Sequence, residues 1–262
     1  MNSKLFIILG NQLFEPKILK TLSCRNVFMA EDFGLCTYEK HHKLKIYLFL
    51  AAMREYRDEL RANSIEVEYF PLEKRVDSSS YSEFLLAYLK EKKISEIEIF
   101  EIEDKEFEAE FLETLSRGGI SVNTHKSPMF MVSREEFADF FAEKQEYRLA
   151  AFYKSMRRKR KLLVSSDLDP IGGKWSFDED NRKRIPKGTK LPHAKGPATS
   201  KYDQAIRLLI DTFFVNHPGE TSNVWFPVTR HGAISHLEDF LNYRMESFGV
   251  FEDVMMCGEN FL

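Results

Sequence analysis

The strongest constraint on the fold is an alternation of short apolar runs with longer helical stretches through the first 125 residues. Residues 5–9 form a continuous apolar run that ends at Gly10, which is typical of a strand buried on both faces. Four further runs predict strands at 27–30, 67–70, 97–102 and 120–122. Helical periodicity appears at 41–62, 81–92 and 107–117. Strands that alternate with helices pair in parallel, so we expect an α/β domain with a doubly wound, five-stranded parallel sheet.

Beyond residue 125 the pattern changes to helices without strands. Ser133, followed by Glu136 three positions later, predicts a capping box at the start of a helix, and a second helix is expected at about 146–164. Residues 165–200 are rich in Pro, Gly, Lys and Asp without periodicity, which indicates a long linker or a functional loop. Helical periodicity returns at 202–215 and 233–248. The expected parts of the chain are residues 1–130, 131–200 and 201–262.

The composition excludes several classes of protein. The chain has 262 residues and 43% hydrophobic residues, enough to bury a sizeable core. Its apolar runs are all shorter than the roughly 20 residues that span a bilayer, and we expect no secretory signal because the apolar part of residues 1–10 is too short. Cys24, Cys36 and Cys257 are odd in number and widely scattered, so we expect neither a disulfide framework nor a metal site. A cytoplasmic location is the simplest expectation.

Positive charge is concentrated in one segment of a chain whose net charge is −3. Residues 154–190 contain twelve Lys or Arg and five Asp or Glu, and a Gly-Gly-Lys-Trp loop lies among them. Such a segment could follow a polyanion, because each neutralised phosphate releases counterions. A solvated helix face followed by a loop is the alternative. The candidate nucleic-acid contacts are Arg157, Arg158, Arg160, Lys174, Arg182 and Lys183.

Polar residues follow the first two expected strands, where the ligands of doubly wound sheets bind. Gly10 and Asn11 follow the first strand and Glu31 follows the second. Residues 37–45 open the long helix with a basic first turn, an arrangement that suits an anionic group. A Gly-x-Gly-x-x-Gly fingerprint is absent, which disfavours ordinary dinucleotide binding. The sequence holds no Ser/His/Asp set or phosphate-binding loop, so its chemistry alone names no reaction.

Taken together, these motifs resemble the photolyase-related branch of the cryptochrome/photolyase superfamily, the bacterial iron–sulfur members that repair (6-4) lesions in DNA. The resemblance covers residues 5 to 262 and rests on motifs in a fixed order. These are Ile-Ile-Leu-Gly-Asn-Gln-Leu at 7–13, Met-Ala-Glu at 29–31, Tyr38 with His-His-Lys-Leu-Lys at 41–45, Ala-Met-Arg at 52–54, Phe-Tyr-Lys-Ser-Met-Arg at 152–157, Gly-Gly-Lys-Trp-Ser-Phe-Asp at 172–178 and Val-Thr-Arg at 228–230.

The resemblance implies that residues 1–130 form a Rossmann-like antenna domain that binds 6,7-dimethyl-8-ribityllumazine. The expected lining, carried over by position, is Gly10, Asn11, Glu31, Tyr38, His42 and Lys45. Full-length members also hold FAD and a 4Fe-4S cluster in a helical domain. We expect residues 201–262 to be the first helices of an incomplete FAD domain, and this chain to hold neither FAD nor the cluster.

The function implied for the parent protein is light-dependent repair of UV-damaged DNA carrying (6-4) lesions. This chain would supply the antenna domain and part of the DNA-facing interdomain region, with no catalytic residue of its own and no repair by itself. A second chain carrying the FAD domain is a possible partner. The alternatives are a non-catalytic module that binds lumazine, flavin or a nucleotide, and a remnant of a split gene. We also expect self-association through exposed apolar side chains, namely Phe213, Phe214, Leu237, Phe240, Leu241 and Phe248.

Overall fold

The computed structural model describes residues 4–75, 79–142, 146–181, 184–189, 196 and 199–254. The chain forms two compact units. The first comprises Met1–Phe130 and Gly196–Ile234, and the second comprises Met131–Lys195 and Ser235–Leu262. Within the described residues, no helix has both the length and the apolar character needed to cross a membrane.

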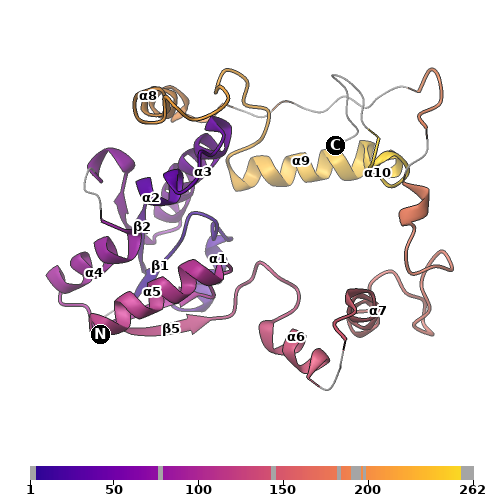
Figure 1. Ribbon diagram of the computed structural model, residues 1–262, viewed down its shortest axis with the longest axis horizontal. Helices are drawn as coiled ribbons and strands as arrows, with labels where there is room; N and C mark the ends of the chain where they lie inside the picture. Colours follow the sequence, from indigo (N-terminus) through magenta and orange to yellow (C-terminus); the bar gives the residue numbers. More distant parts are fainter. Residues whose placement is uncertain are drawn as a thin grey trace. The chain divides into compact units, whose positions relative to one another are not determined.

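The first unit is built on a five-stranded parallel sheet in the order β3-β2-β1-β4-β5, which confirms the expected α/β fold (Figure 1). In β1, Leu5 pairs with Asn26 of β2 on one side and with Ile97 of β4 on the other. The order reverses between β1 and β4, so the topological switch point lies there. The strands are β1 (Leu5–Ile7), β2 (Asn26–Ala30), β3 (Glu66–Phe70), β4 (Glu96–Phe100) and β5 (Ser121–His125).

Helices cover both faces of this sheet. Apolar residues of α1 (Pro16–Thr21) and α3 (Lys43–Ala62) pack on one face, and those of α4 (Tyr81–Glu91) and α5 (Lys105–Arg117) pack on the other. The sequence missed α1, α2 (Phe33–Thr37) and the 3-10 turn η1 (Leu72–Lys74). Each is too short to develop the periodicity of an amphipathic helix.

The turns that return the chain from helix to strand share one geometry. A residue with positive φ follows the helix, and the next residue donates its N–H back to the carbonyl five positions earlier, the Schellman arrangement. After α3, for example, Ser64 has φ 61° and Ile65 donates to Leu60 at 3.1 Å. The left-handed residues at the ends of α1, α3, α4 and α5 are Ser23, Ser64, Lys93 and Gly119. These turns direct each strand into the sheet with its carboxyl end at one shared edge.

A third cluster of apolar side chains joins α8 (Asp203–Phe213) to the outer side of α3 (Figure 1). Ile206, Leu209 and Ile210 are buried in it. Phe214 is also buried, against Phe33, so the expectation that it is exposed is wrong. The apolar face of α8 is used within the first unit. Phe213, Leu237 and Leu241 are exposed as expected.

The second unit is helical. Ser133 and Glu136 form the expected capping box at the start of α6 (Arg134–Phe141). Helix α7 (Leu149–Lys159) is shorter than the expected 146–164, because Lys161 takes a positive φ of 53° and ends it in another Schellman turn. Beyond α7 lie the 3-10 turn η2 (Asp178–Asp180) and α10 (Met245–Phe251). Helix α9 (Arg230–Tyr243) begins in the first unit and ends in the second.

Candidate functional site

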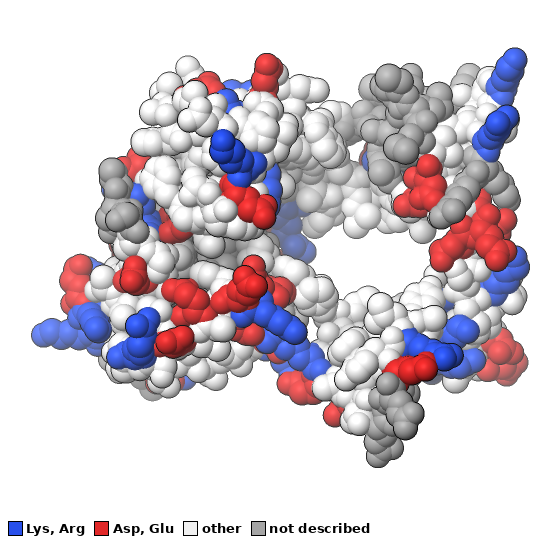
Figure 2. Space-filling model, in the orientation of Figure 1, with Lys and Arg blue, Asp and Glu red and all other residues white. Residues whose placement is uncertain are grey.

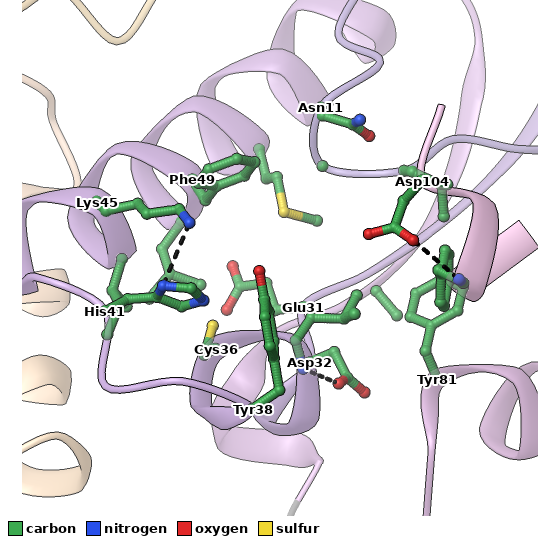
Figure 3. Close-up of a pocket in the computed structure, with 18 of the residues that line it drawn as sticks. Asn11, Glu31, Asp32, Cys36, Tyr38, His41, Lys45, Phe49, Tyr81 and Asp104 are labelled. Carbon is green, nitrogen blue, oxygen red and sulfur yellow. Dashed lines mark hydrogen bonds between the residues drawn. The ribbon is translucent and has the colours of Figure 1, made fainter. Parts of the chain in front are cut away.

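A cavity of about 230 Å³ lies where β1, β2 and β4 end, at the switch point of the sheet (Figure 3). Its walls come from the loops after these strands, from α2 and from the first half of α3. In Figure 3, His41 and Lys45 lie on one side of the cavity and Tyr81 and Asp104 on the other. A polar rim around a mostly apolar interior is typical of small-molecule sites.

The apolar wall depends on a close approach between the β1 loop and α3. A Cβ atom placed on Gly10 would lie 3.0 Å from the Met53 sulfur and 3.3 Å from a ring carbon of Phe49. All three residues line the cavity. Glycine at position 10 therefore lets the loop pack against α3 while the Phe49 ring stays available to a ligand.

Glu31 follows β2 and is fully buried beside Arg54 of α3. Arg54 Nε donates to Oε1 at 2.7 Å and Arg54 Nη2 donates to Oε2 at 2.9 Å. The Tyr69 hydroxyl donates to Oε1 at 2.5 Å, and the Leu72 amide donates to Oε2 at 2.7 Å. Four hydrogen bonds use the acceptor positions of this carboxylate. Glu31 thus lines the cavity, but its carboxylate is already hydrogen-bonded within the protein and connects β2, β3 and α3.

Asp32, the next residue, makes a second buried pair. Its Oδ1 accepts from the Leu35 amide at 2.8 Å and so caps α2. Its Oδ2 lies 2.6 Å from Nη1 of Arg75, whose guanidinium also stacks over the Phe84 ring at 4.1 Å. This pair fixes α2, and with it the cavity-lining residues that α2 contributes.

His41 and Lys45 form the basic side of the cavity mouth, with Lys45 Nζ 3.2 Å from His41 Nδ1. Burial and the charge of Lys45 both lower the pKa of His41, so its ring is neutral at pH 7. Since the ammonium can only donate, we assign Nδ1 as the acceptor and place the ring proton on Nε2. Tyr38 contacts the His41 ring edge-on at 4.7 Å, and its hydroxyl points into the cavity in Figure 3.

Two lining residues carry polar atoms that need a partner. The Tyr81 hydroxyl and His41 Nε2 are buried and have no hydrogen-bond partner among the described residues. Burial also raises the pKa of Tyr81, so its hydroxyl keeps its proton. Both atoms are donors, and unpaired buried donors are costly. A ligand with acceptor atoms toward both sides would satisfy them.

The cavity gathers five of the six residues expected in the lining, namely Gly10, Asn11, Glu31, Tyr38 and Lys45. His42 does not line the cavity. Its Nδ1 accepts from the Leu44 amide at 3.0 Å, which caps α3, and its ring packs so closely on Gly219 that a Cβ there would lie 1.9 Å from Nε2. Its neighbour His41 takes the lining position instead.

Asp32, His41, Tyr81 and Asp104 also line the cavity, although the sequence pattern did not indicate them. Asp104 accepts from the Phe107 amide at 2.9 Å and caps α5. Aspartate directly after an apolar run and before a helix is a recognisable capping signal, and it could have placed Asp32 and Asp104 at this edge.

The cysteines of the described chain show no sign of reactivity. Burial raises the pKa of Cys36, which lines the cavity, to about 12, and that of Cys24 to about 11. Cys257 lies outside the described residues. In the part of the chain that the structure describes, no group of three or more His, Cys, Asp or Glu side chains could hold a metal ion.

Arg157, a candidate nucleic-acid contact, is buried in the second unit. Its guanidinium donates to the Leu162, Leu163 and Trp175 carbonyls and to the Tyr153 hydroxyl. These bonds tie α7 to the loop that follows. Arg157 therefore stabilises the second unit, whereas the sequence had predicted that it contacts a phosphate.

The other basic candidates are more accessible. Arg158 is exposed and covers the Trp175 ring at 4.6 Å, and Lys174 is exposed beside Phe177. Arg160 pairs with Glu136 at 2.7 Å. Arg182 and Lys183 lie outside the described residues. Basic and acidic side chains are interspersed on the face seen in Figure 2.

These features define an α/β protein with a partly apolar cavity at the switch point of a parallel sheet. The chain matches the deoxyribodipyrimidine photo-lyase-related protein family over residues 6–226 and belongs to that family. It is 29% identical over 261 residues to a (6-4) photolyase of Agrobacterium fabrum (strain C58 / ATCC 33970), an alignment that covers 97% of this chain and 50% of the relative. The chain thus spans about half the length of this curated relative.

Proposed function

We propose that the cavity binds a ribityl-lumazine antenna chromophore, 6,7-dimethyl-8-ribityllumazine, within a photolyase-like protein that repairs UV-damaged DNA in light. The observation that carries this proposal is the composition of the cavity. In a chain of the photolyase-related family, it combines an apolar wall with buried donors on Tyr81 and His41 that lack partners among the described residues. A lumazine ring offers flat apolar faces and carbonyl and nitrogen acceptors at its edge.

In this proposal the ring and the ribityl chain contact different parts of the lining. Phe49, Met53 and Ile102 would hold the ring by apolar contact, while the Tyr81 hydroxyl and His41 Nε2–H would donate to its acceptors. Lys45, Asn11 and Asp104 lie in the lining as polar partners for a hydroxylated chain. The bound chromophore would supply absorption of near-ultraviolet and violet light.

The role in repair rests on the family and on the (6-4) photolyase relative. In this proposal the first unit harvests light, and exposed basic residues of the second unit contact DNA. The FAD and the 4Fe-4S cluster of full-length members are assigned to no residue of this chain.

The first test is an absorption and fluorescence spectrum of the purified chain, with release and mass identification of any chromophore. Lumazine, FMN and ATP are then added separately to chromophore-free protein. We expect lumazine to bind, and Leu35→Trp, which adds bulk at an exposed lining position, to weaken binding at least tenfold. Leu112→Trp makes the same change on α5 outside the lining and serves as the control.

Each ligand gives a distinct result. Binding of FMN or ATP without lumazine would support the alternative of a flavin- or nucleotide-binding module. Lumazine binding that Leu35→Trp leaves unchanged would show that the chromophore site lies elsewhere. Failure of all three ligands to bind would overturn the proposal.

A further inference from the structure

A second cavity, of about 590 Å³, lies in the second unit between α7 and the loop that contains Trp175. Three aromatic residues line it, and two of them are strongly exposed, Tyr153 by 49% and Phe177 by 47%. Leu149 and Ile171 are exposed lining residues as well. Large apolar side chains gathered around one open cavity indicate a binding site.

The walls of this cavity are fixed in place. Arg157 lies in the lining and joins Tyr153 to the Trp175 backbone through its hydrogen bonds. Gly172 has a φ of 85°, and a Cβ there would lie 2.8 Å from the Phe177 ring. The loop backbone therefore packs directly against Phe177. Because the side chains of this surface are already held in place, they lose little conformational entropy when a ligand binds.

Exposed cations near the cavity favour an anionic ligand. Residues 154–180 contain seven Lys or Arg and five Asp or Glu, and three of these cations, Arg157, Lys159 and Arg160, bond other groups of the second unit. Arg158 and Lys161 are exposed at the end of α7, and Lys174 is exposed on the loop. Ser176 and Asp178 add hydrogen-bonding groups to the lining. Aromatic faces flanked by cations match a base with its adjoining phosphates.

We infer that this cavity is a stacking site for one unpaired base of single-stranded DNA, with the flanking phosphates on the surrounding cations. The inference rests on the DNA contact proposed above and adds recognition of a base. A peptide would match the apolar lining but offers no phosphates to Arg158, Lys161 and Lys174. A duplex would match the charge but keeps its bases stacked inside.

The test uses the full chain and a single-stranded oligonucleotide with one central 2-aminopurine, whose fluorescence is quenched by stacking. A matched oligonucleotide carries an abasic site at that position. We expect the chain to quench the probe and to bind it about tenfold more tightly than the abasic strand, in line with aromatic stacking on one base. Phe177→Ala should abolish both effects, whereas Phe130→Ala, at another exposed phenylalanine, should change neither.

Equal affinity for the two strands, or quenching that survives Phe177→Ala, would overturn the stacking site while leaving electrostatic DNA binding intact. Absence of binding to either strand would overturn the DNA contact itself. Lumazine binding in the first unit is measured separately and is unaffected by these outcomes.

Discussion

The guanidinium of Arg54 lies against the carboxylate of Glu31 in a two-pronged pair, with contacts of 2.7 and 2.9 Å, directly beneath the candidate chromophore cavity. Burial lowers the pKa of Arg54, but the hydrogen bond and charge of Glu31 outweigh it and leave that pKa raised. Arg54 therefore stays ionised in the folded protein. The pair connects the end of β2 to the middle of α3 and sets the distance between two walls of the cavity.

Arg54→Met should destabilise the protein by about 3–5 kcal/mol, because it leaves the Glu31 carboxylate buried without its cation. The double variant Glu31→Gln/Arg54→Met should regain part of that loss, since no buried charge then remains. Urea unfolding measures the free energy of unfolding of both variants. Lys17→Met, which breaks an exposed pair with Glu15, should cost about 1 kcal/mol or less. A loss for Arg54→Met no greater than that of Lys17→Met would contradict the structural role of the pair.

Gly10→Ala should weaken chromophore binding about tenfold while changing the free energy of unfolding by less than about 1 kcal/mol. The added methyl meets the flexible end of Met53 and the edge of Phe49, so these side chains must shift into the cavity. Fluorescence titration with lumazine measures the affinity. Gly249→Ala, where nothing lies within 4 Å of the new Cβ, is the matched control. Unchanged affinity in Gly10→Ala would indicate that the ligand does not use this wall.

The sequence predicted the sheet well because β1 and β2 are nearly continuous apolar runs and because amphipathic helices separate the strands. It also predicted the edge where Gly10, Asn11 and Glu31 meet, since the carboxyl ends of parallel strands share one edge. The sequence could not show that the carboxylate oxygens of Glu31 already accept four hydrogen bonds from the protein. Its partners come from α3, β3 and η1, and only the folded arrangement brings them together.

The sequence could not show that Arg157 is buried, for a different reason. In the sequence it is one of five consecutive basic residues. Its carbonyl partners face it because the chain reverses through left-handed residues at Lys161 and Leu163, a conformation that non-glycine residues rarely adopt. No pattern of side-chain types predicts such a turn.

Asp58→Asn should reduce stability at pH 5 and lose that effect as the pH falls to about 2. Burial raises the pKa of Asp58, but hydrogen bonds from Lys201, Tyr202 and Arg57 outweigh it and lower that pKa to about 2. The folded state thus binds fewer protons than the unfolded state, whose aspartate titrates near about 4. The contribution is complete above about pH 4 and disappears as the pH falls through the folded pKa.

Urea unfolding between pH 5 and pH 2.5 measures this dependence. Glu113→Gln, which removes a carboxylate at an exposed position on α5, is the control. A constant difference for Asp58→Asn would contradict the proposed contribution of its bonds to the segment that leads into α8.

Arg158→Ala and Lys174→Ala should each lower the salt dependence of DNA binding by about 0.9 in the slope of log K against log salt, if each neutralises one phosphate. Arg157→Ala should instead lower the unfolding temperature, because its hydrogen bonds hold α7 to the loop. Fluorescence anisotropy at several salt concentrations gives the slopes. Lys17→Ala, in the first unit, is the control. If neither substitution changes the slope of log K against log salt, Arg158 and Lys174 are solvated and do not contact phosphates.

Helix α9 carries a stripe of exposed apolar side chains that should cause self-association. Ile234, Leu237 and Leu241 follow one another at helical spacing and are 42–54% exposed. Because an exposed stripe of this kind gains free energy when it is covered, we expect the mass measured by sedimentation to rise with protein concentration.

Leu237→Glu/Leu241→Glu should return the protein to a monomer, because each charge would have to be buried in the contact. Leu112→Glu places the same charge at an exposed position on α5 and should leave the association unchanged. A chain that remains monomeric at high concentration before any substitution would refute the prediction. Association that survives the double substitution would place the contact on another surface.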